Sequence, residues 1–339
     1  MLKVLVPDVP TAGEILPYLR RIDEAKQYTN TGPLVQELER RMGGVTTSSA
    51  TTGLELAARC VFKRRQVRVP AFTFAASVTA LLRAGLEPVL CDVGDDWALV
   101  SPDEHSLNVC PFGAPVRGGG LIDAASAWGN QHEGARVFSL HATKALPAGE
   151  GGLVCGDAEL IARIRRLANF GLEATPFAHG IVTEAGTNAK LSEYHAAVAL
   201  AALDRWDATA AWRVALSGMY RERLYDLRWQ PRPHGVYTTF PVMVRNADAV
   251  ARDMASEGIE TRRWYTPTME RHPAFRSLKV DGPLERCNRL NDELLCLPFH
   301  AGVIPHIDRV CEVLKWAITR NDRVRSFTKR RTSSAIASA

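Results

Sequence analysis

The chain has 339 residues, of which 46% are hydrophobic and 23% charged, and its formal net charge at pH 7 is +5. This ordinary globular composition provides a large core and excludes a fibrous or wholly disordered protein. No run approaches the roughly 18 apolar residues of a membrane span, and the first residues lack the apolar segment of a signal peptide, so we expect a cytoplasmic protein with no membrane partner.

The cysteines and the basic residues argue against two further kinds of site. The seven cysteines form no CxxC pair and show no Cys/His spacing typical of zinc, so we expect no metal. Basic residues gather near the end of the chain, followed by Ser and Ala. We expect residues 321–339 to form a basic, disordered tail rather than a nucleic-acid-binding arm, and we expect no nucleic-acid partner.

Helical and strand patterns alternate through the first third of the chain. Residues 1–30 are predicted to be an N-terminal arm that carries a helix. Further helices are predicted from Pro33, at 50–62 and up to Arg83, and strands at 66–69, 88–93 and 107–110. Strands that alternate with helices are typical of parallel βαβ units, so we expect an α/β fold.

One connection is too short for that pattern. Only the glycine-rich residues Pro111 to Gly120 separate strand 107–110 from the next strand, which ends at Asp123. A crossover between parallel neighbours usually needs about a dozen residues or more. We predict that this connection contains no helix. One face of the sheet would then be thinly covered or closed by a neighbouring subunit.

An acid and a lysine follow the ends of two buried strands. Asp123 ends an apolar run, and Lys144 lies among small and apolar residues after the strand-like residues 137–140. Apolar surroundings lower the pKa of a lysine, and the neutral amine is a nucleophile that can form a Schiff base. A carboxylate can keep a pyridine nitrogen protonated, and this pairing is expected of a pyridoxal phosphate (PLP) site. Taken alone, Asp123 is also compatible with a helix cap and Lys144 with a solvated loop.

The second half of the chain divides into two parts. A helix is predicted at 157–170, capped by Asp157, followed by a loop at 172–186 that could lie over a site, and by an alanine-rich helix that ends near 204. We expect a large domain at 31–215 and a small domain at 216–320. A long helix at 209–227 is predicted to link the two domains. The small domain is predicted to hold strands at 238–244 and 260–265 and helices at 247–256, 283–291 and 304–318.

Several segments together resemble one family of enzymes. They are DAA at 123–125, SLHATK at 139–144, GEGG at 149–152, YTNTGPL at 28–34, VPAFTF at 69–74 and GTNAKLSE at 186–193. In this order they are similar to the nucleotide-sugar aminotransferases of the DegT/StrS group, which are fold-type-I PLP enzymes related to aspartate aminotransferase. The resemblance spans about Pro10 to Lys315. It implies a mixed, mostly parallel central sheet flanked by helices, with a smaller α+β C-terminal lobe.

The resemblance also implies roles for individual residues. Lys144 would hold PLP, and Asp123 would keep the ring nitrogen charged. The remaining cofactor-binding positions are Ala50 and Thr51 at the phosphate, Phe74 stacked on the ring, Ser126 near the ring hydroxyl, Ser139 on the phosphate side, and Asn188 from the partner of a homodimer. Ala50 stands where the family usually has Gly, Ser126 where it often has Gln or His, and Lys190 is a second candidate for the contact of Asn188.

The implied reaction moves an amino group, from glutamate by family habit, to a nucleotide-linked keto-sugar. The substrate-binding candidates are Arg262, Arg263, Tyr265 and His300, because arginine suits bidentate phosphate contacts and a Leu-Pro-x-His turn resembles the family's. Two alternatives are a sugar dehydratase or deoxygenase on the same scaffold and a non-catalytic regulator. Lys144 and the absence of a cysteine cluster argue against the first, and the complete set of Lys144, Asp123 and Ser139 argues against the second. The sequence leaves the sugar, its ring carbon and the nucleotide open.

Overall fold

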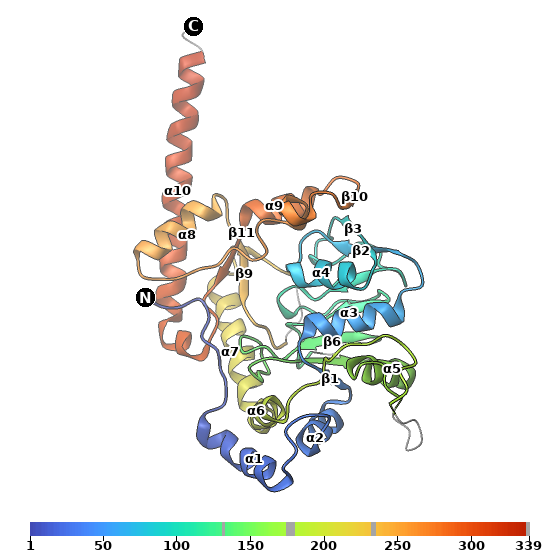
Figure 1. Ribbon diagram of the computed structural model, residues 1–339. Helices are drawn as coiled ribbons and strands as arrows, with labels where there is room; N and C mark the ends of the chain where they lie inside the picture. The colour runs from blue at the N-terminus through green and yellow to red at the C-terminus, as the bar shows by residue number, and fades with distance from the viewer. Residues whose placement is uncertain (131–132, 174–179, 232–234, 337–339) are drawn as a thin grey trace.

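The computed structural model describes residues 1–130, 133–173, 180–231 and 235–336 and shows a large domain and a smaller lobe (Figure 1). The large domain contains a five-stranded sheet in the order β1-β7-β6-β5-β4. These strands are β1 (Val45–Thr47), β7 (Gly152–Cys155), β6 (Arg136–Ser139), β5 (Leu121–Asp123) and β4 (Leu107–Val109). The neighbours β4, β5 and β6 run parallel, whereas β7 pairs antiparallel with both β6 and β1.

A second group of strands continues this sheet beyond β4. Strands β2 (Gln66–Pro70), β3 (Glu87–Cys91) and β10 (Lys279–Asp281) pair in parallel, in the order β10-β3-β2. Arg68 of β2 bridges Ser106 in parallel, and its amide donates to the carbonyl of His105 at 3.0 Å. The mixed, mostly parallel sheet expected from the sequence is therefore confirmed.

Helices cover both faces of this sheet. The helices α3 (Ala50–Val61), α4 (Ala75–Arg83) and α5 (Ala158–Ala168) pack into one apolar cluster on the first face. The helices α1 (Ala12–Ala25), α2 (Pro33–Met42) and α6 (Glu193–Asp204) pack into a second cluster on the other face. Asp157 caps α5 as expected, since its side chain accepts from the amide of Leu160.

The smaller lobe is built on a three-stranded antiparallel sheet with a core of its own. Its strands are β8 (Arg228–Trp229), β9 (Phe240–Met243) and β11 (Leu294–Leu297), and its helices are α7 (Trp206–Arg223), α8 (Ala247–Ser256), α9 (Glu285–Glu293) and α10 (Ile307–Ile336). The first residues of the chain also reach this lobe, where Leu2 bridges Ile259. No helix in the described part of the chain combines the length and apolarity needed to cross a membrane.

The short connection at 111–120 has the predicted character. These residues, all of them described, contain no α-helix, and only a single 3-10 turn at Pro111–Gly113. Val116 from this connection and Ala98 from the preceding loop are buried on the sheet face beside Ile122. Two loops therefore take over part of the covering that a crossover helix would provide.

Two expectations for the C-terminal part were wrong. Residues 260–265 do not form a strand, because only Arg262 pairs, with Cys296, before the chain turns. The helix expected at 304–318 instead begins at Ile307 and runs to Ile336, into the segment expected to be disordered. No Gly or Pro occurs after Pro305, so the sequence contains nothing that would end the helix earlier. Residues 337–339 of the expected tail lie outside the described residues.

Candidate active site

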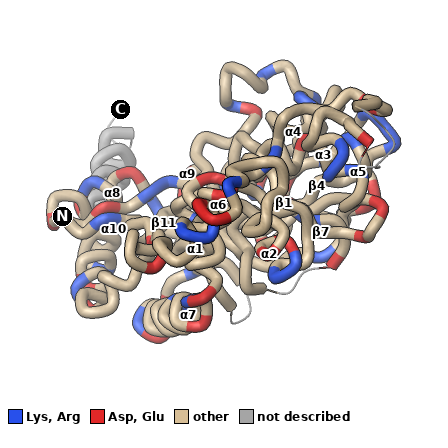
Figure 2. The backbone as a smooth tube through the Cα atoms, turned by 60° about the horizontal axis from the view of Figure 1, so that its bottom comes forward, with Lys and Arg blue, Asp and Glu red and all other residues tan. Residues whose placement is uncertain are grey.

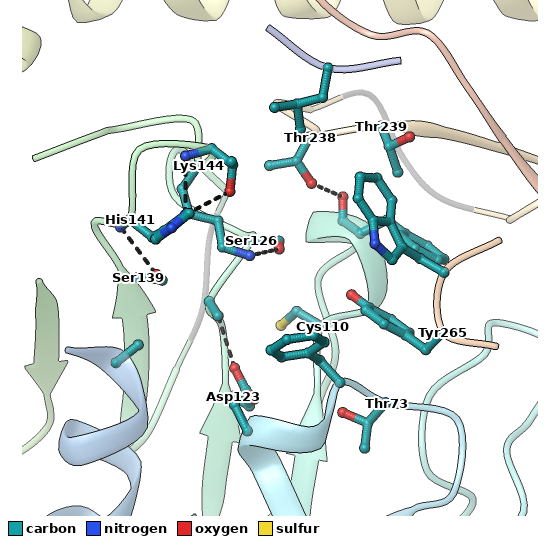
Figure 3. Close-up of a pocket in the computed structure, with 18 of the residues that line it drawn as sticks. Thr73, Cys110, Asp123, Ser126, Ser139, His141, Lys144, Thr238, Thr239 and Tyr265 are labelled. Carbon is teal, nitrogen blue, oxygen red and sulfur yellow. Dashed lines mark hydrogen bonds between the residues drawn. The ribbon is translucent and has the colours of Figure 1, made fainter. Parts of the chain in front are cut away.

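A cavity of about 640 Å³ lies between the large domain and the smaller lobe. Its walls combine the carboxyl ends of β4, β5 and β6, the first residues of α3 and α4, and segments of the smaller lobe. Parallel α/β sheets bind ligands at this edge, because the strand ends and helix N-termini meet there. Figure 3 shows Lys144 and Ser126 on one wall of the cavity and Tyr265 on the opposite wall.

Lys144 lies in the turn that follows β6. Its amide donates to the carbonyl of His141 at 2.9 Å, and its Nζ donates to Oγ of Ser126 at 3.1 Å. Burial lowers the pKa of the Lys144 amine, and the nearby Asp123 carboxylate only partly opposes this effect. The amine therefore loses its proton more readily than a surface lysine does, as its apolar neighbours in the sequence predicted.

Asp123 ends β5 and is 5% exposed. Its Oδ2 accepts from Oγ of Ser77 at 2.6 Å, and its Oδ1 accepts from the amide of Ala125 at 3.1 Å. Burial raises the pKa of the Asp123 carboxyl, while these hydrogen bonds and Lys144 act in the opposite direction. Asp123 is not a helix cap. It is a buried acid held in one orientation and facing the cavity, where a cationic partner would stabilise its charge.

The first turn of α3 opens onto the cavity. Ser49 caps this helix, and its Oγ accepts from the amide of Thr52 at 3.1 Å. Ala50 and Thr51 line the cavity, and the first amides of a helix have no intrahelical partner, so they can bind an anion. Ser139, at the end of β6, lines the same region and accepts from the amide of His141 at 3.2 Å.

Aromatic side chains form another part of the wall. Phe74 is 60% exposed and lines the cavity at the start of α4. Tyr265 is stacked on Phe112, with ring centroids 5.0 Å apart, and its ring is also 6.4 Å from that of Phe74. Burial raises the pKa of Tyr265, so its hydroxyl stays protonated. A planar ring bound beside Phe74 would find an aromatic face available for stacking.

The structure does not bring every candidate residue to the cavity. Arg262 lines it, but Arg263 points elsewhere, toward Asp248 and the carbonyl of Asn291. His300 also stays outside, and its Nε2 lies 3.0 Å from the carbonyl oxygen of Lys3.

Asn188 lies outside its own chain's cavity as well. It is exposed, and its Oδ1 accepts from Nζ of Lys190 at 2.7 Å. The loop that was expected to lie over a site, 172–186, falls partly outside the described residues. Its described end packs against α5, where Glu184 forms two hydrogen bonds with Arg163.

Sequence reasoning missed several residues around the site. Ser77 and Thr73 form a hydroxyl pair, 2.8 Å apart, behind Asp123. Lys3 and Glu260 line the cavity from segments far apart in the chain. Spacing offered no signal for Lys3, although the run VPAFTF already placed Thr73 beside the predicted Phe74.

The residues present fit pyridoxal phosphate. The cavity joins an amine with a lowered pKa, a buried acid held by two donors, a helix N-terminus suited to a phosphate and an exposed aromatic face. Each feature matches one part of the cofactor: its aldehyde, its ring nitrogen, its phosphate and its ring. Among the described residues, no group of three His, Cys, Asp or Glu side chains is arranged to hold a metal.

The fold and this site define a PLP-dependent aminotransferase. The sequence profile of the DegT/DnrJ/EryC1/StrS aminotransferase family matches residues 11–111 and 121–315, and the chain belongs to this family. The stretch between the two matched ranges is the short connection that lacks a crossover helix.

Related proteins match nearly the whole chain. Two are named dTDP-4-amino-4,6-dideoxy-D-glucose transaminase: one from Shigella dysenteriae, 27% identical over 348 residues, and one from Escherichia coli, 28% identical over 355 residues. Each match covers 88% of this chain and 94% of the relative. The crystal structure of DesI in the presence of its TDP-sugar product superposes with a TM-score of 0.83 at 30% identity, covering 96% of both chains.

Proposed function

We propose that this enzyme transfers an amino group from glutamate to a nucleotide-linked keto-sugar, giving an amino-sugar. The observation that carries the proposal is the meeting of Lys144, Asp123 and the α3 N-terminus in one cavity. The names of the relatives support the substrate class, because they refer to transaminases of a dTDP-linked sugar and to a TDP-sugar product. The cytoplasmic location expected from the sequence stays a prediction.

The residues of the site have distinct tasks in this reaction. Bound PLP supplies the aldehyde that accepts the amino group and a ring that draws electrons from the donor's Cα. Nζ of Lys144, with its lowered pKa, would act as the base for the proton on the donor's Cα. Asp123 would stabilise a protonated ring nitrogen, and Ser126 accepts a hydrogen bond from the Lys144 amine. The same groups would serve the reverse proton transfer when the keto-sugar takes up the amino group.

The proposal includes a homodimer in which Asn188 reaches the partner's phosphate site. Asn188 is exposed on the surface of its own chain, away from the cavity that Lys144 lines. Tyr194 lies six residues after Asn188 in the sequence and stacks on Tyr28, with ring centroids 6.3 Å apart, and both side chains are about half exposed. Exposed aromatic surface of this kind is typical of an interface.

The experiment that tests this function follows the visible absorption of the PLP-loaded protein. Adding glutamate should bleach the visible band, and adding a nucleotide-linked keto-sugar should then restore it. Lys144→Ala should lose both the band and turnover, because the variant lacks the amine that would hold PLP. Lys279→Ala, an exposed lysine on β10, is the matched control. A wild-type band that glutamate leaves unchanged would contradict transamination from this donor.

A further inference from the structure

The first residues of the chain form part of the cavity wall. Lys3, Val4 and Leu5 line the cavity, although they are far in sequence from the other lining segments. Backbone bonds fix this segment to the smaller lobe. The amide of Leu2 donates to Gly258 at 2.7 Å, the amide of Glu260 donates to Leu2 at 2.9 Å, and the amide of Phe299 donates to Val4 at 2.9 Å.

Side chains of the smaller lobe hold the same segment in place. The amide of Val4 donates to Oε2 of Glu260 at 3.4 Å, and His300 Nε2 lies 3.0 Å from the Lys3 carbonyl oxygen. His300, expected from the sequence to bind substrate, thus supports the backbone of Lys3 from outside the cavity. Lys3 is therefore presented to the cavity from a backbone that is anchored on both sides.

Two cations flank one acid on this wall. Nζ of Lys3 lies 3.9 Å from Glu260, and Nη2 of Arg262 donates to Oε1 of the same carboxylate at 2.9 Å. The side chain of Glu260 is only 23% exposed, whereas those of Lys3 and Arg262 are 62% and 56% exposed. The acid is thus turned inward between its partners, and both cations keep further N–H groups available to an anion.

Depth in the cavity separates this cluster from the reacting groups. Asp123 is 5% exposed at the inner end, whereas Lys3 and Arg262 lie at its open rim. A ligand that reaches both Lys144 and the rim must have its anionic group separated from its reacting carbon. A nucleotide-linked sugar meets this requirement, because the sugar ring lies between the keto carbon and the diphosphate. The carboxylates of a small amino donor would instead bind near the inner end.

We propose that Lys3 and Arg262 bind the diphosphate of the nucleotide-linked substrate and that Glu260 positions both cations. This inference rests on the proposed function, since it assumes that the substrate carries a diphosphate. It assigns the N-terminal segment to substrate recognition. Arg262 supplies a planar, bidentate contact and Lys3 a point charge, so the cluster recognises phosphate oxygens without reading the base.

The test measures binding of TDP, UDP and the nucleoside thymidine to the PLP-loaded enzyme by titration calorimetry. Lys3→Ala and Arg262→Ala should each lower the affinity for both diphosphates about tenfold or more, since each variant removes a charge-assisted hydrogen bond. Binding of thymidine should be unchanged. Lys279→Ala and Arg64→Ala, exposed residues outside the cavity, should bind all three ligands like the wild type.

Several results would overturn this inference. The first is a wild-type enzyme that binds neither diphosphate. The second is a pair of variants that keep the wild-type affinity for the diphosphates. The third is a pair of variants whose affinity for thymidine falls as much as their affinity for TDP. A glutamate half-reaction slowed as much as diphosphate binding is weakened would assign the cations to the donor instead. The bleaching of the wild-type band by glutamate is read separately, so failure of the diphosphate site and failure of the proposed function remain distinguishable.

Discussion

Lys144 and Asp123 show how burial changes the pKa of individual residues. Each attracts the charged form of the other, yet for both groups burial is the largest influence on the pKa. The result is an amine with a lowered pKa and a carboxyl with a raised pKa. Replacing two such buried ionisable groups with apolar residues often stabilises a protein. Keeping them therefore lowers the free energy of unfolding.

The first prediction at this scale concerns stability of the PLP-free protein. The folded pKa of Asp123 is raised, so the native state binds this proton more tightly than the unfolded state does. The stabilisation from protonated Asp123 is fully present below the ordinary pKa of an aspartate and is lost as pH rises through the folded pKa. An asparagine at this position stays neutral, so Asp123→Asn does not lose stability in this way as pH rises. We expect the variant to melt at a higher temperature than the wild type near pH 7 and the difference to shrink as pH falls.

The asparagine variant can keep the hydrogen bonds that surround Asp123, so the comparison isolates the effect of charge. The new amide oxygen can keep the bond from Ala125, and Ser77 can accept from the new NH₂ group while it donates to Thr73. Thermal melts between about pH 4 and 8 measure the effect. A variant less stable than the wild type throughout this range would contradict the raised pKa.

The same substitution should damage the reaction. A neutral amide cannot hold a positive charge on the cofactor's ring nitrogen, so electron withdrawal from the donor's Cα weakens. We expect Asp123→Asn to slow the glutamate half-reaction by about a hundredfold or more, an effect comparable to the loss of one preorganised electrostatic group. Single-turnover absorbance measures the rate. A half-reaction at the wild-type rate would show that Asp123 does not serve the ring nitrogen.

At the scale of elements, the short connection between β4 and β5 carries part of the site. Phe112 in its 3-10 turn stacks on Tyr265, and Gly113 lies against the backbone of Ser126, which holds the Lys144 amine. Gly113 has φ +96°, and a Cβ there would meet the carbonyl oxygen of Ser126 at 2.5 Å. Glycine is thus required both by backbone conformation and by the space beside Ser126.

Gly113→Ala should destabilise the enzyme and disturb its cofactor site. The backbone conformation alone costs a residue with a Cβ about 1–3 kcal/mol, and the contact with Ser126 adds to this. Urea unfolding should show the loss, and PLP should bind more weakly because Ser126 is displaced. Gly218→Ala is the control, because this glycine lies in α7 with open space at its Cβ position. That variant should gain about 0.5–1 kcal/mol. Equal behaviour of the two variants would contradict the steric argument.

At the scale of the whole molecule, the proposed active site is built from two lobes and from the N-terminal segment of the chain. The large domain supplies Lys144 and Asp123, and the smaller lobe with the N-terminal segment supplies the opposite wall of the cavity. Lys and Arg segments are interspersed with Asp and Glu segments along α1, α2, α6 and α7 in Figure 2.

The proposed homodimer leads to a prediction at this scale. If Asn188 completes the partner's site, Lys144→Ala and Asn188→Ala proteins are each inactive or impaired, but their heterodimer contains one intact site. Mixing equal amounts, with exchange of subunits, should recover roughly a quarter of wild-type activity, because half of the dimers are mixed and each has one working site. Steady-state turnover before and after exchange measures this. Activity that never exceeds the average of the two separate variants would place Asn188 in its own chain's site or in none.

The sequence alone led to the class of fold and to the centre of the site. Alternating strand and helix patterns are local, and the ends of parallel strands meet at one edge, so Asp123 and Lys144 could be placed together from spacing and resemblance. The glycine-rich stretch at 111–120 likewise ruled out a helix from its length and composition. These features depend on neighbours along the chain, and sequence patterns record such neighbours directly.

Only the tertiary structure decided which distant side chains complete the cavity. Arg262 and Arg263 are adjacent in sequence, yet Arg262 lines the cavity whereas Arg263 pairs with Asp248. Lys3 reaches the rim through pairing of Leu2 with Ile259. Leu2 and Ile259 are more than two hundred residues apart in the chain, so no local periodicity encodes their pairing, and it exists only once the chain has folded.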